Sequence, residues 1–275
     1  MPIHDDLGKR MKEFYENVPK TKLMRRTPVA IRIDGKVFHT FTRGFNKPFD
    51  DVLISAMQDT MKYLCENIQG CVLGYTQSDE ITLILVDYKR LNSSAWFDYE
   101  VQKMCSIAAS MATMAFNKAF NEGVQHRNLS YYAAHATTDN PYPQDDLGQT
   151  YAVKAQIGAM FDARCFNIPK EEVTNLVYWR QLDATRNSIQ MVGQANFSHK
   201  ELQGKSCEKI KEMLIAEKGI SWEDLYPMYQ HGSCCIKVTT EIDGVTRSSW
   251  EIDKNIPLFV GEGREYIESL IQCEE

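Results

Sequence analysis

The alternation of apolar and polar residues predicts three strands and one helix in the first ninety residues. Residues 29–33 (VAIRI) place apolar side chains on one face of a strand that ends at Asp34–Gly35. Cys71–Thr76 and Ile81–Val86 predict two more strands, joined by the short polar turn Gln77–Glu80. From about Pro48, before this pair, apolar residues recur at the spacing of one helix face: Leu53, Met57, Met61, Leu64 and Ile68.

The pattern continues with a second predicted helix over about Phe97–Asn121 and two further predicted strands, Ser130–Ala136 and Met160–Ile168. Thr138–Gly148 carries two prolines and several turn formers, which predicts a long surface loop. The order strand, helix, strand, strand, helix, strand is that of a ferredoxin-like fold. We therefore predict an α+β protein with a ferredoxin-like (βαββαβ) core.

The pattern of predicted elements changes after residue 168. Two helices and a hairpin that turns at Asp243–Gly244 are predicted there: Lys170–Gln194, His199–Lys218, and Ser233–Thr240 with Thr246–Asp253. Residues 1–24 predict a polar helix that precedes the core. We therefore expect a core domain over residues 1–168 and a C-terminal helical and hairpin appendage over residues 169–275.

Carboxylates follow two strands of this core. The first and second strands run parallel, so the end of the first and the turn after the second lie at one sheet edge, which brings Asp34 beside Asp79 and Glu80. Crowded carboxylates repel and are stabilised by a divalent cation. Oxygen ligands suit Mg²⁺, and two such ions can stabilise the attacking and leaving oxygens of a phosphoryl transfer. Each motif alone is more typical of a solvated turn than of a catalytic site, so the prediction depends on their meeting at one edge.

We therefore predict Asp34, Asp79 and the backbone carbonyl of Gly35 as metal ligands, and Asp34, Asp79 and Glu80 as catalytic residues. Arg32 shares a strand face with Asp34 and could reach phosphates, and Lys47 precedes a helix N-terminus, where anions bind. Both are also typical of solvated surface residues. No P-loop, GxGxxG or Ser-His-Asp arrangement is present.

Composition changes this picture little. The 275 residues carry a net charge of −6, which argues against a small basic nucleic-acid module, although local patches rather than net charge contact phosphates. The eight cysteines form no CxxC pair, no apolar run is long enough to cross a bilayer, and no signal-peptide pattern is seen. We expect a cytoplasmic protein with free thiols and no membrane partner.

Several motifs together resemble the tRNA-His guanylyltransferase superfamily, most clearly over residues 25–125. They are RIDG (32–35), FHTF (38–41), FNKPFD (45–50), GYTQSDE (74–80), FDAR (161–164) and WRQ (179–181). The resemblance implies a polymerase-like palm domain. In such a protein an RNA 5′ end is activated and then attacked by the 3′-hydroxyl of a nucleoside triphosphate. The resemblance also implies two Mg²⁺ ions, tRNA, GTP, ATP and other nucleoside triphosphates as substrates, and a homotetramer.

The resemblance assigns further positions. Asp34 and Asp79 match the family's metal carboxylates, with Gly35 giving a carbonyl ligand and Glu80 as the acidic neighbour. Six residues match positions around the nucleotide: Arg32, His39, Phe45, Lys47, Asp50 and Ser78. Three residues, aligned across an insertion around residues 91–97, match positions that hold a triphosphate: Lys103, Ser106 and Ser110.

One motif departs from the eukaryotic enzymes, which carry HINNLYNT after the tryptophan helix. This chain has TRNSIQMV (185–192), with Thr185 in place of the histidine. The sequence thus resembles the bacterial and archaeal Thg1-like branch. This favours template-directed repair of 5′-truncated tRNA over dedicated addition of one guanosine to tRNA-His. A nucleotidyl cyclase, which shares the palm topology, and a non-catalytic RNA-binding module stay open as alternatives.

Overall fold

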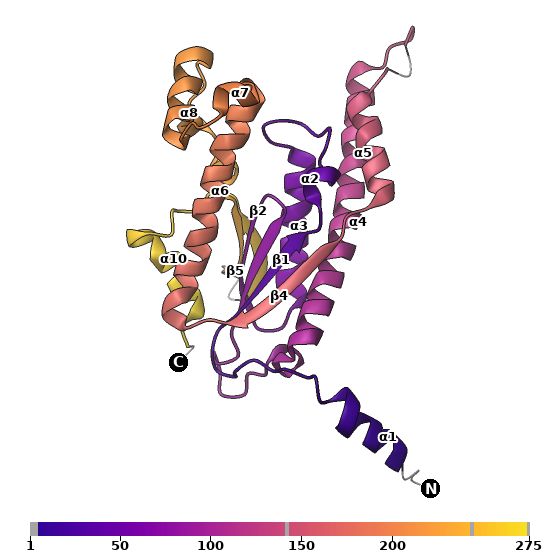
Figure 1. Ribbon diagram of the computed structural model, residues 1–275, viewed down its shortest axis with the longest axis vertical. Coiled ribbons are helices and arrows are strands. Elements are labelled where there is room, and N and C mark those ends of the chain that lie inside the picture. The colour runs from indigo at the N-terminus through magenta and orange to yellow at the C-terminus, as the bar shows by residue number, and fades with distance from the viewer. Residues whose placement is uncertain (1–4, 141–142, 243–244, 274–275) are drawn as a thin grey trace.

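A single six-stranded antiparallel sheet lies at the centre of the molecule (Figure 1). The computed structural model describes residues 5–140, 143–242 and 245–273. The strand order is β4-β1-β3-β2-β5-β6. The strands are β1 Val29–Gly35, β2 Cys71–Gln77, β3 Glu80–Leu85, β4 Phe161–Asn167, β5 Ser233–Ile242 and β6 Val245–Asp253.

The first four strands form the ferredoxin-like core that the sequence predicts. β1 and β2 both pair antiparallel with β3, so they run in the same direction. β4 pairs antiparallel with the other side of β1. The mixed helix-and-sheet fold class is therefore confirmed, and the ends of β1 and β2 reach the same edge of the sheet.

Two long helices cover one face of the sheet, α3 (Asp51–Asn67) and α4 (Val101–His135) (Figure 1). Their buried side chains, among them Met61 and Phe116, pack with Ile31, Ile33 and Leu83 of the strands. Each such side chain, fully removed from water, stabilises the fold by about 1.5–3 kcal/mol. α5 (Asp146–Ile157) packs against α4 and contributes Tyr151 to the same core.

The opposite face is only partly covered. α6 (Val173–Asn196) and α10 (Glu265–Glu268) lie over it and bury Val173, Val177 and Ile267 with Tyr75 and Ile84 of the sheet. The open-face side chains of β1 and β4 near Arg32 and Asp34 are less buried. The remaining helices are short: α1 Asp6–Met11, α2 Phe38–Phe41, α7 His199–Leu202, α8 Cys207–Met213 and α9 Pro227–His231.

The C-terminal hairpin extends the core sheet. β5 pairs with β2 through Gly74–Cys235, Tyr75–Cys234 and Thr76–Ser233, and β6 pairs with β5. The predicted turn at Asp243–Gly244 lies outside the described residues. The division into a core domain (residues 1–168) and an appendage (residues 169–275) stays a prediction. In the structure the two parts share one sheet.

Several predicted elements differ in the structure. Ser130–Ala136 was predicted as a strand, and this is wrong: residues 130–135 are the end of α4. Contacts four residues apart are made in this helix, where Tyr131 stacks on His135 at 4.2 Å and lies under Arg127. The predicted loop ends early because Asp145 caps α5 through the backbone amide of Gly148.

The helices predicted from about Pro48 and over Lys170–Gln194 correspond to α3 and to the 3-10 turn and α6. The other helix predictions are right in type and differ in length, and the one over Phe97–Asn121 begins at Val101 and continues to His135. The N-terminal helix covers only Asp6–Met11 and the π-helical turn Lys12–Glu16. His199–Lys218 is broken by Gly204, whose φ of 73° is disfavoured for other residues. Among the described residues, no helix is long and apolar enough to span a membrane.

Candidate functional site

The end of β1 meets the turn between β2 and β3. The backbone amide of Gly35 donates a hydrogen bond to the carbonyl oxygen of Asp79 at 3.0 Å. Asp34 lies directly opposite Glu80 in the β1–β3 pairing. Because strand register and this hydrogen bond fix both backbones, the two segments are held together independently of their side chains. The predicted meeting of Asp34 and Asp79 is what the structure shows.

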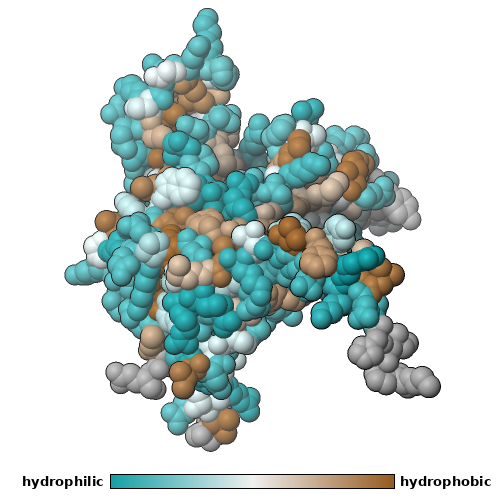
Figure 2. Space-filling model, turned by 60° about the horizontal axis from the view of Figure 1, so that its bottom comes forward, coloured by the Kyte–Doolittle hydropathy of each residue, from teal (hydrophilic) through white to brown (hydrophobic). Residues whose placement is uncertain are grey.

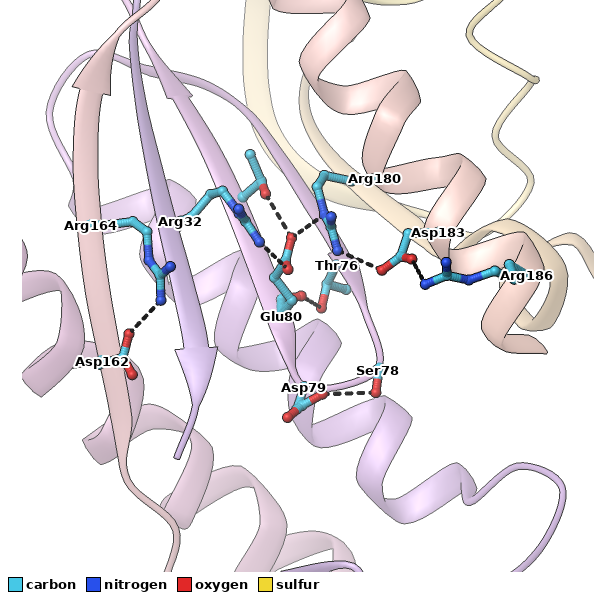
Figure 3. A network of polar contacts seen from close by, with 11 residues as sticks. Arg32, Thr76, Ser78, Asp79, Glu80, Asp162, Arg164, Arg180, Asp183 and Arg186 are labelled. Carbon is cyan, nitrogen blue, oxygen red and sulfur yellow. Dashed lines mark hydrogen bonds and ion pairs between the residues drawn. The ribbon is translucent and has the colours of Figure 1, made fainter. Parts of the chain in front are cut away.

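A tight turn presents Asp79. Gln77 pairs with Glu80, so only Ser78 and Asp79 form the loop of the hairpin. Ser78 has a φ of 51°, a left-handed conformation that two-residue hairpin loops require. Its hydroxyl donates to Oδ1 of Asp79 at 2.9 Å (Figure 3). Ser78 therefore orients the carboxylate at the sheet edge.

The two aspartates lie in an electrostatic environment that disfavours two negative charges. Burial, followed by the charges of Asp79 and Glu80, raises the pKa of Asp34. Burial also raises the pKa of Asp79, although the hydrogen bond from Ser78 opposes this rise. A cation at this edge would remove the unfavourable charge in both cases.

The carboxylate oxygens of Asp34 and Asp79 are suitable ligands for a hard divalent cation. Both supply oxygen ligands, they come from backbone segments joined by a hydrogen bond, and burial, with a smaller contribution from neighbouring carboxylates, raises the pKa of each. Among the described residues, no three His, Cys, Asp or Glu side chains are grouped so as to hold a metal ion. The metal site of Asp34, Asp79 and the Gly35 carbonyl therefore stays a prediction.

The carboxylate of Glu80 has other partners. Its Oε2 lies 2.6 Å from Nη2 of Arg32, and its Oε1 lies 2.7 Å from Nε of Arg180 on α6 (Figure 3). Arg180 also binds Asp183 at 2.9 Å. Glu80 and Arg180 are both buried, so they neutralise each other in a place where an unpaired charge would be costly. This arrangement supports a positioning role for Glu80, and its predicted catalytic role stays a prediction.

A cavity of about 290 Å³ adjoins the turn that carries Asp79. Four residues predicted around the nucleotide line it together: Phe45, Lys47, Asp50 and Ser78. Its opposite wall comes from α6 and the segment before β5, including Asn187, Met191 and Tyr229. Apolar walls with a few polar groups are typical of a pocket for a small organic ligand.

The loop at the cavity mouth is fixed by Asp50. This buried carboxylate accepts hydrogen bonds from the amides of Asn46 at 3.0 Å and Leu53 at 2.9 Å, and from the hydroxyl of Tyr151. Asp50 thus caps α3 and holds the segment that carries Lys47. Its contacts are those of a residue that shapes the cavity.

The other predicted site residues lie at different distances from the aspartates. His39 on α2 lies near enough to lower the pKa of Asp79 by its charge. Lys103, Ser106 and Ser110 are exposed on α4. Thr113 of α4 contacts Phe161, which pairs with Gly35, so Lys103 lies about 15 Å along the helix from the level of the carboxylate edge. By the same measure Ser106 lies about 10 Å and Ser110 about 5 Å from that level, so Lys103 is set well apart from the aspartates. The predicted contact of all three residues with a triphosphate stays a prediction.

Sequence reasoning assigned no role to Arg180, or to the cavity residues Asn187 and Tyr229. The WRQ motif was a signal for Arg180, but its pairing with Glu80 spans 100 positions. Tyr229 stacks on Phe49 at 4.7 Å and donates to Asp51 at 2.6 Å. These contacts depend on how the C-terminal region packs against the core, which no local motif specifies.

The sheet order, the two aspartates at one edge and the adjoining cavity define a palm-type fold of the nucleotidyl-transfer class. Comparison with known sequences then identifies the family. The profile of the Thg1 family, tRNAHis guanylyltransferase, matches residues 8–169. The chain belongs to this family of nucleotidyltransferases.

Solved structures and curated sequences agree with this assignment. A bacterial tRNA(His) guanylyltransferase (Thg1)-like protein in complex with ATP is 39% identical, with a TM-score of 0.78, and the match covers 97% of this chain and 99% of that one. Such a protein in complex with GTP is 36% identical, with a TM-score of 0.75 and the same coverage. tRNA(His) guanylyltransferase 2 of Arabidopsis thaliana is 23% identical over 282 residues, covering 98% of this chain and 48% of that protein.

Proposed function

We propose that this protein is a 3′-to-5′ nucleotidyltransferase that adds nucleotides to the 5′ end of tRNA, with template-directed repair of 5′-truncated tRNA as its activity. The observation that carries the proposal is the placement of Asp34 and Asp79 at one sheet edge, beside a cavity that suits a nucleotide. Family membership and the ATP and GTP complexes of its bacterial relatives support the substrate class.

Within this proposal, Asp34, Asp79 and the carbonyl of Gly35 hold Mg²⁺, and the two-ion arrangement stays an expectation. Bound magnesium would stabilise charge on the attacking and leaving oxygens of the phosphoryl transfer. The chain's own residues bind and orient the nucleotide. Lys47, at the cavity wall before α3, attracts the triphosphate, and Ser78 holds the Asp79 carboxylate in place. Glu80 holds Arg32 on the same strand face as Asp34.

A second candidate activity is the dedicated addition of one guanosine to tRNA-His, which the names of the curated relatives favour. Thr185 at the position of the eukaryotic motif's histidine supports repair instead. In this structure the Thr185 hydroxyl lies 3.0 Å from Nδ1 of His231. This part of α6 thus contacts the segment before β5.

We further propose a homotetramer in the cytoplasm. The helical segment Asp6–Glu16 buries none of its residues and extends away from the body of the molecule (Figure 1). Its apolar residues Leu7, Met11 and Phe14 are exposed and pack against no core of this chain. An isolated helix of this length is marginal in water, so contact with another copy would stabilise it. On the face drawn in Figure 2, hydrophobic residues lie in separate patches within a largely hydrophilic surface.

The decisive experiment offers the purified protein a tRNA that lacks its first nucleotide, with all four nucleoside triphosphates and Mg²⁺. Addition of the nucleotide complementary to the opposite base supports repair, and addition of guanosine alone, whatever the template, supports the second candidate. Chelation of the metal should stop the reaction. Release of pyrophosphate without RNA would indicate a nucleotidyl cyclase and refute the proposal.

A further inference from the structure

Trp179 is a large aromatic side chain left exposed beside Arg32 of β1. It lies on α6 and is 52% exposed, whereas the next two residues, Arg180 and Gln181, are buried. Burial in the core therefore does not explain its position. In proteins that bind single-stranded nucleic acid, exposed aromatic rings are surfaces on which bases stack.

Two guanidinium groups hold the indole ring. Cζ of Arg32 lies 5.4 Å from the ring centroid of Trp179, and Cζ of Arg180 lies 4.5 Å from it. Both arginines are bound to the buried carboxylate of Glu80. Arg180 also pairs with Asp183, so several charged contacts hold the two guanidinium groups that flank the ring. The ring is therefore pre-organised, and a ligand that stacks on it need not order it.

The ring contacts Arg32 on the strand that carries Asp34, and it lies outside the cavity. Arg32 precedes Asp34 by two residues on the same strand face, a separation of about 7 Å along β1. α6 contributes Ala184, Asn187 and Met191 to the cavity lining, and Trp179 is not among the lining residues. One helix thus presents two surfaces near the same edge, and the ring is available to a different base from the one in the cavity.

Cationic groups that could bind phosphate lie next to the ring. Arg164 of β4 pairs directly with Arg32 across the sheet, and its side chain is 57% exposed with Asp162 at 3.2 Å. Nε of Arg32 is buried and has no hydrogen-bond partner among the described residues. Arginines beside an exposed aromatic ring match the two parts of a nucleotide, its phosphate and its base.

We propose that Trp179 stacks on the nucleobase of the activated 5′ end, while the cavity holds the incoming nucleotide. This inference rests on the proposed function. The ligand chemistry is a nucleobase joined to a 5′-phosphate. The terminal nucleotide of the RNA or the nucleotide that activates it can supply this chemistry, and the experiment separates the two sources.

The test compares Trp179→Ala, Trp179→Phe and Trp179→Leu with wild type. Binding of a fluorescein-labelled 5′-truncated tRNA is followed by anisotropy, and binding of ATP is followed separately by calorimetry. We expect Trp179→Ala to weaken one of these affinities about 5- to 150-fold, which corresponds to the loss of one stacked base. Phe should restore most of the affinity, and Leu, which fills space without stacking, should not.

Leu182→Ala is the matched control, because Leu182 lies one turn further along α6 and is 50% exposed. It should bind both ligands as wild type does. Salt dependence gives a second readout. Trp179→Ala should leave the slope of log Kd against log salt unchanged, whereas Arg164→Ala should lower its magnitude by about one if Arg164 contacts a phosphate.

Weakened tRNA binding assigns the ring to the RNA terminus, and weakened ATP binding assigns it to the activating nucleotide. Equal affinity of Trp179→Leu and Trp179→Phe for both ligands, with unchanged melting temperatures, would overturn the stacking role. Binding is measured without turnover, so its outcome is independent of nucleotide addition. A wild-type protein that binds tRNA through Trp179 but adds no nucleotide would refute the proposed function alone.

Discussion

The backbone amide of Gly35 lies 3.0 Å from the carbonyl oxygen of Asp79, and this hydrogen bond joins the end of β1 to the turn after β2. It brings together two carboxylates, Asp34 and Asp79, that are far apart in the sequence. The bond involves only backbone atoms, so side-chain substitutions at the two aspartates can be tested without removing it.

Asp34→Asn should abolish nucleotide addition, with a loss of at least about a hundred-fold, because a divalent cation supplies several kcal/mol of charge stabilisation in the transition state. The fold should survive. Burial and neighbouring carboxylates raise the pKa of Asp34, so its ionised form destabilises the metal-free protein at neutral pH. Asn should therefore raise the metal-free melting temperature at pH 7, and this gain should vanish at a pH below the ordinary pKa of Asp. Near-wild-type activity would contradict the metal assignment.

Gly35→Ala should distort the carboxylate edge. A Cβ at this position would lie 2.2 Å from Cδ2 of Phe38, whose ring is buried in the core. Overpacking of this kind costs about 1–3 kcal/mol, measured as the free energy of unfolding in urea. Gly123→Ala on α4 is the control, because its Cβ would meet only Val52, at 3.2 Å, and helix propensity compensates. Equal stability of both variants would show that the edge tolerates a methyl group.

Glu80→Gln separates a structural role from a chemical one. It removes the buried negative charge that Arg32 and Arg180 share, so we expect a loss of up to about 3–5 kcal/mol in unfolding free energy. Asp183→Asn, which removes the more exposed partner of Arg180, should cost less. The readouts are chemical denaturation and single-turnover addition. A Glu80→Gln protein of normal stability that adds no nucleotide would instead place Glu80 in the metal site.

Lys47→Ala should raise KM for the incoming nucleoside triphosphate with a smaller effect on kcat. A hydrogen bond to a charged group contributes about 1.5–3 kcal/mol, which corresponds to a change of roughly 10- to 150-fold. Lys200→Ala removes the same charge from the exposed helix α7 and should leave KM unchanged. An unaltered KM in Lys47→Ala would mean that the cavity is not where the triphosphate binds.

The stability of the protein should fall in mild acid because of His231. Burial lowers the pKa of His231, and its Nδ1 lies 3.0 Å from the Thr185 hydroxyl. The unfolded chain binds more protons than the folded one below the ordinary histidine pKa of about 6.5, so unfolding free energy decreases as pH falls from there through the folded pKa. His231→Gln should flatten this slope between pH 7 and pH 5. An unchanged slope would assign the acid sensitivity to other groups.

Local pattern predicted the elements that carry the site. The alternation in residues 29–33 and the polar turn Gln77–Glu80 predict two strands and the turn whose meeting places Asp34 beside Asp79, because the topology of a split βαβ unit leaves few alternatives. The same reasoning was wrong for Ser130–Ala136. A strand and a helix end can share composition, and contacts four residues apart decided between them.

The sequence by itself determined the βαββαβ order and the meeting of Asp34 and Asp79, since these follow from periodicity and motifs within single elements. The residues expected around a nucleotide come from the resemblance and stay a prediction. Only the tertiary structure decided that Glu80 is bound by Arg32 and Arg180, that α6 closes a cavity over Ser78, and that Trp179 remains exposed. Each of these depends on how α6 packs over the sheet. Packing between elements distant in sequence depends on shape and burial across the whole core, which no local pattern encodes.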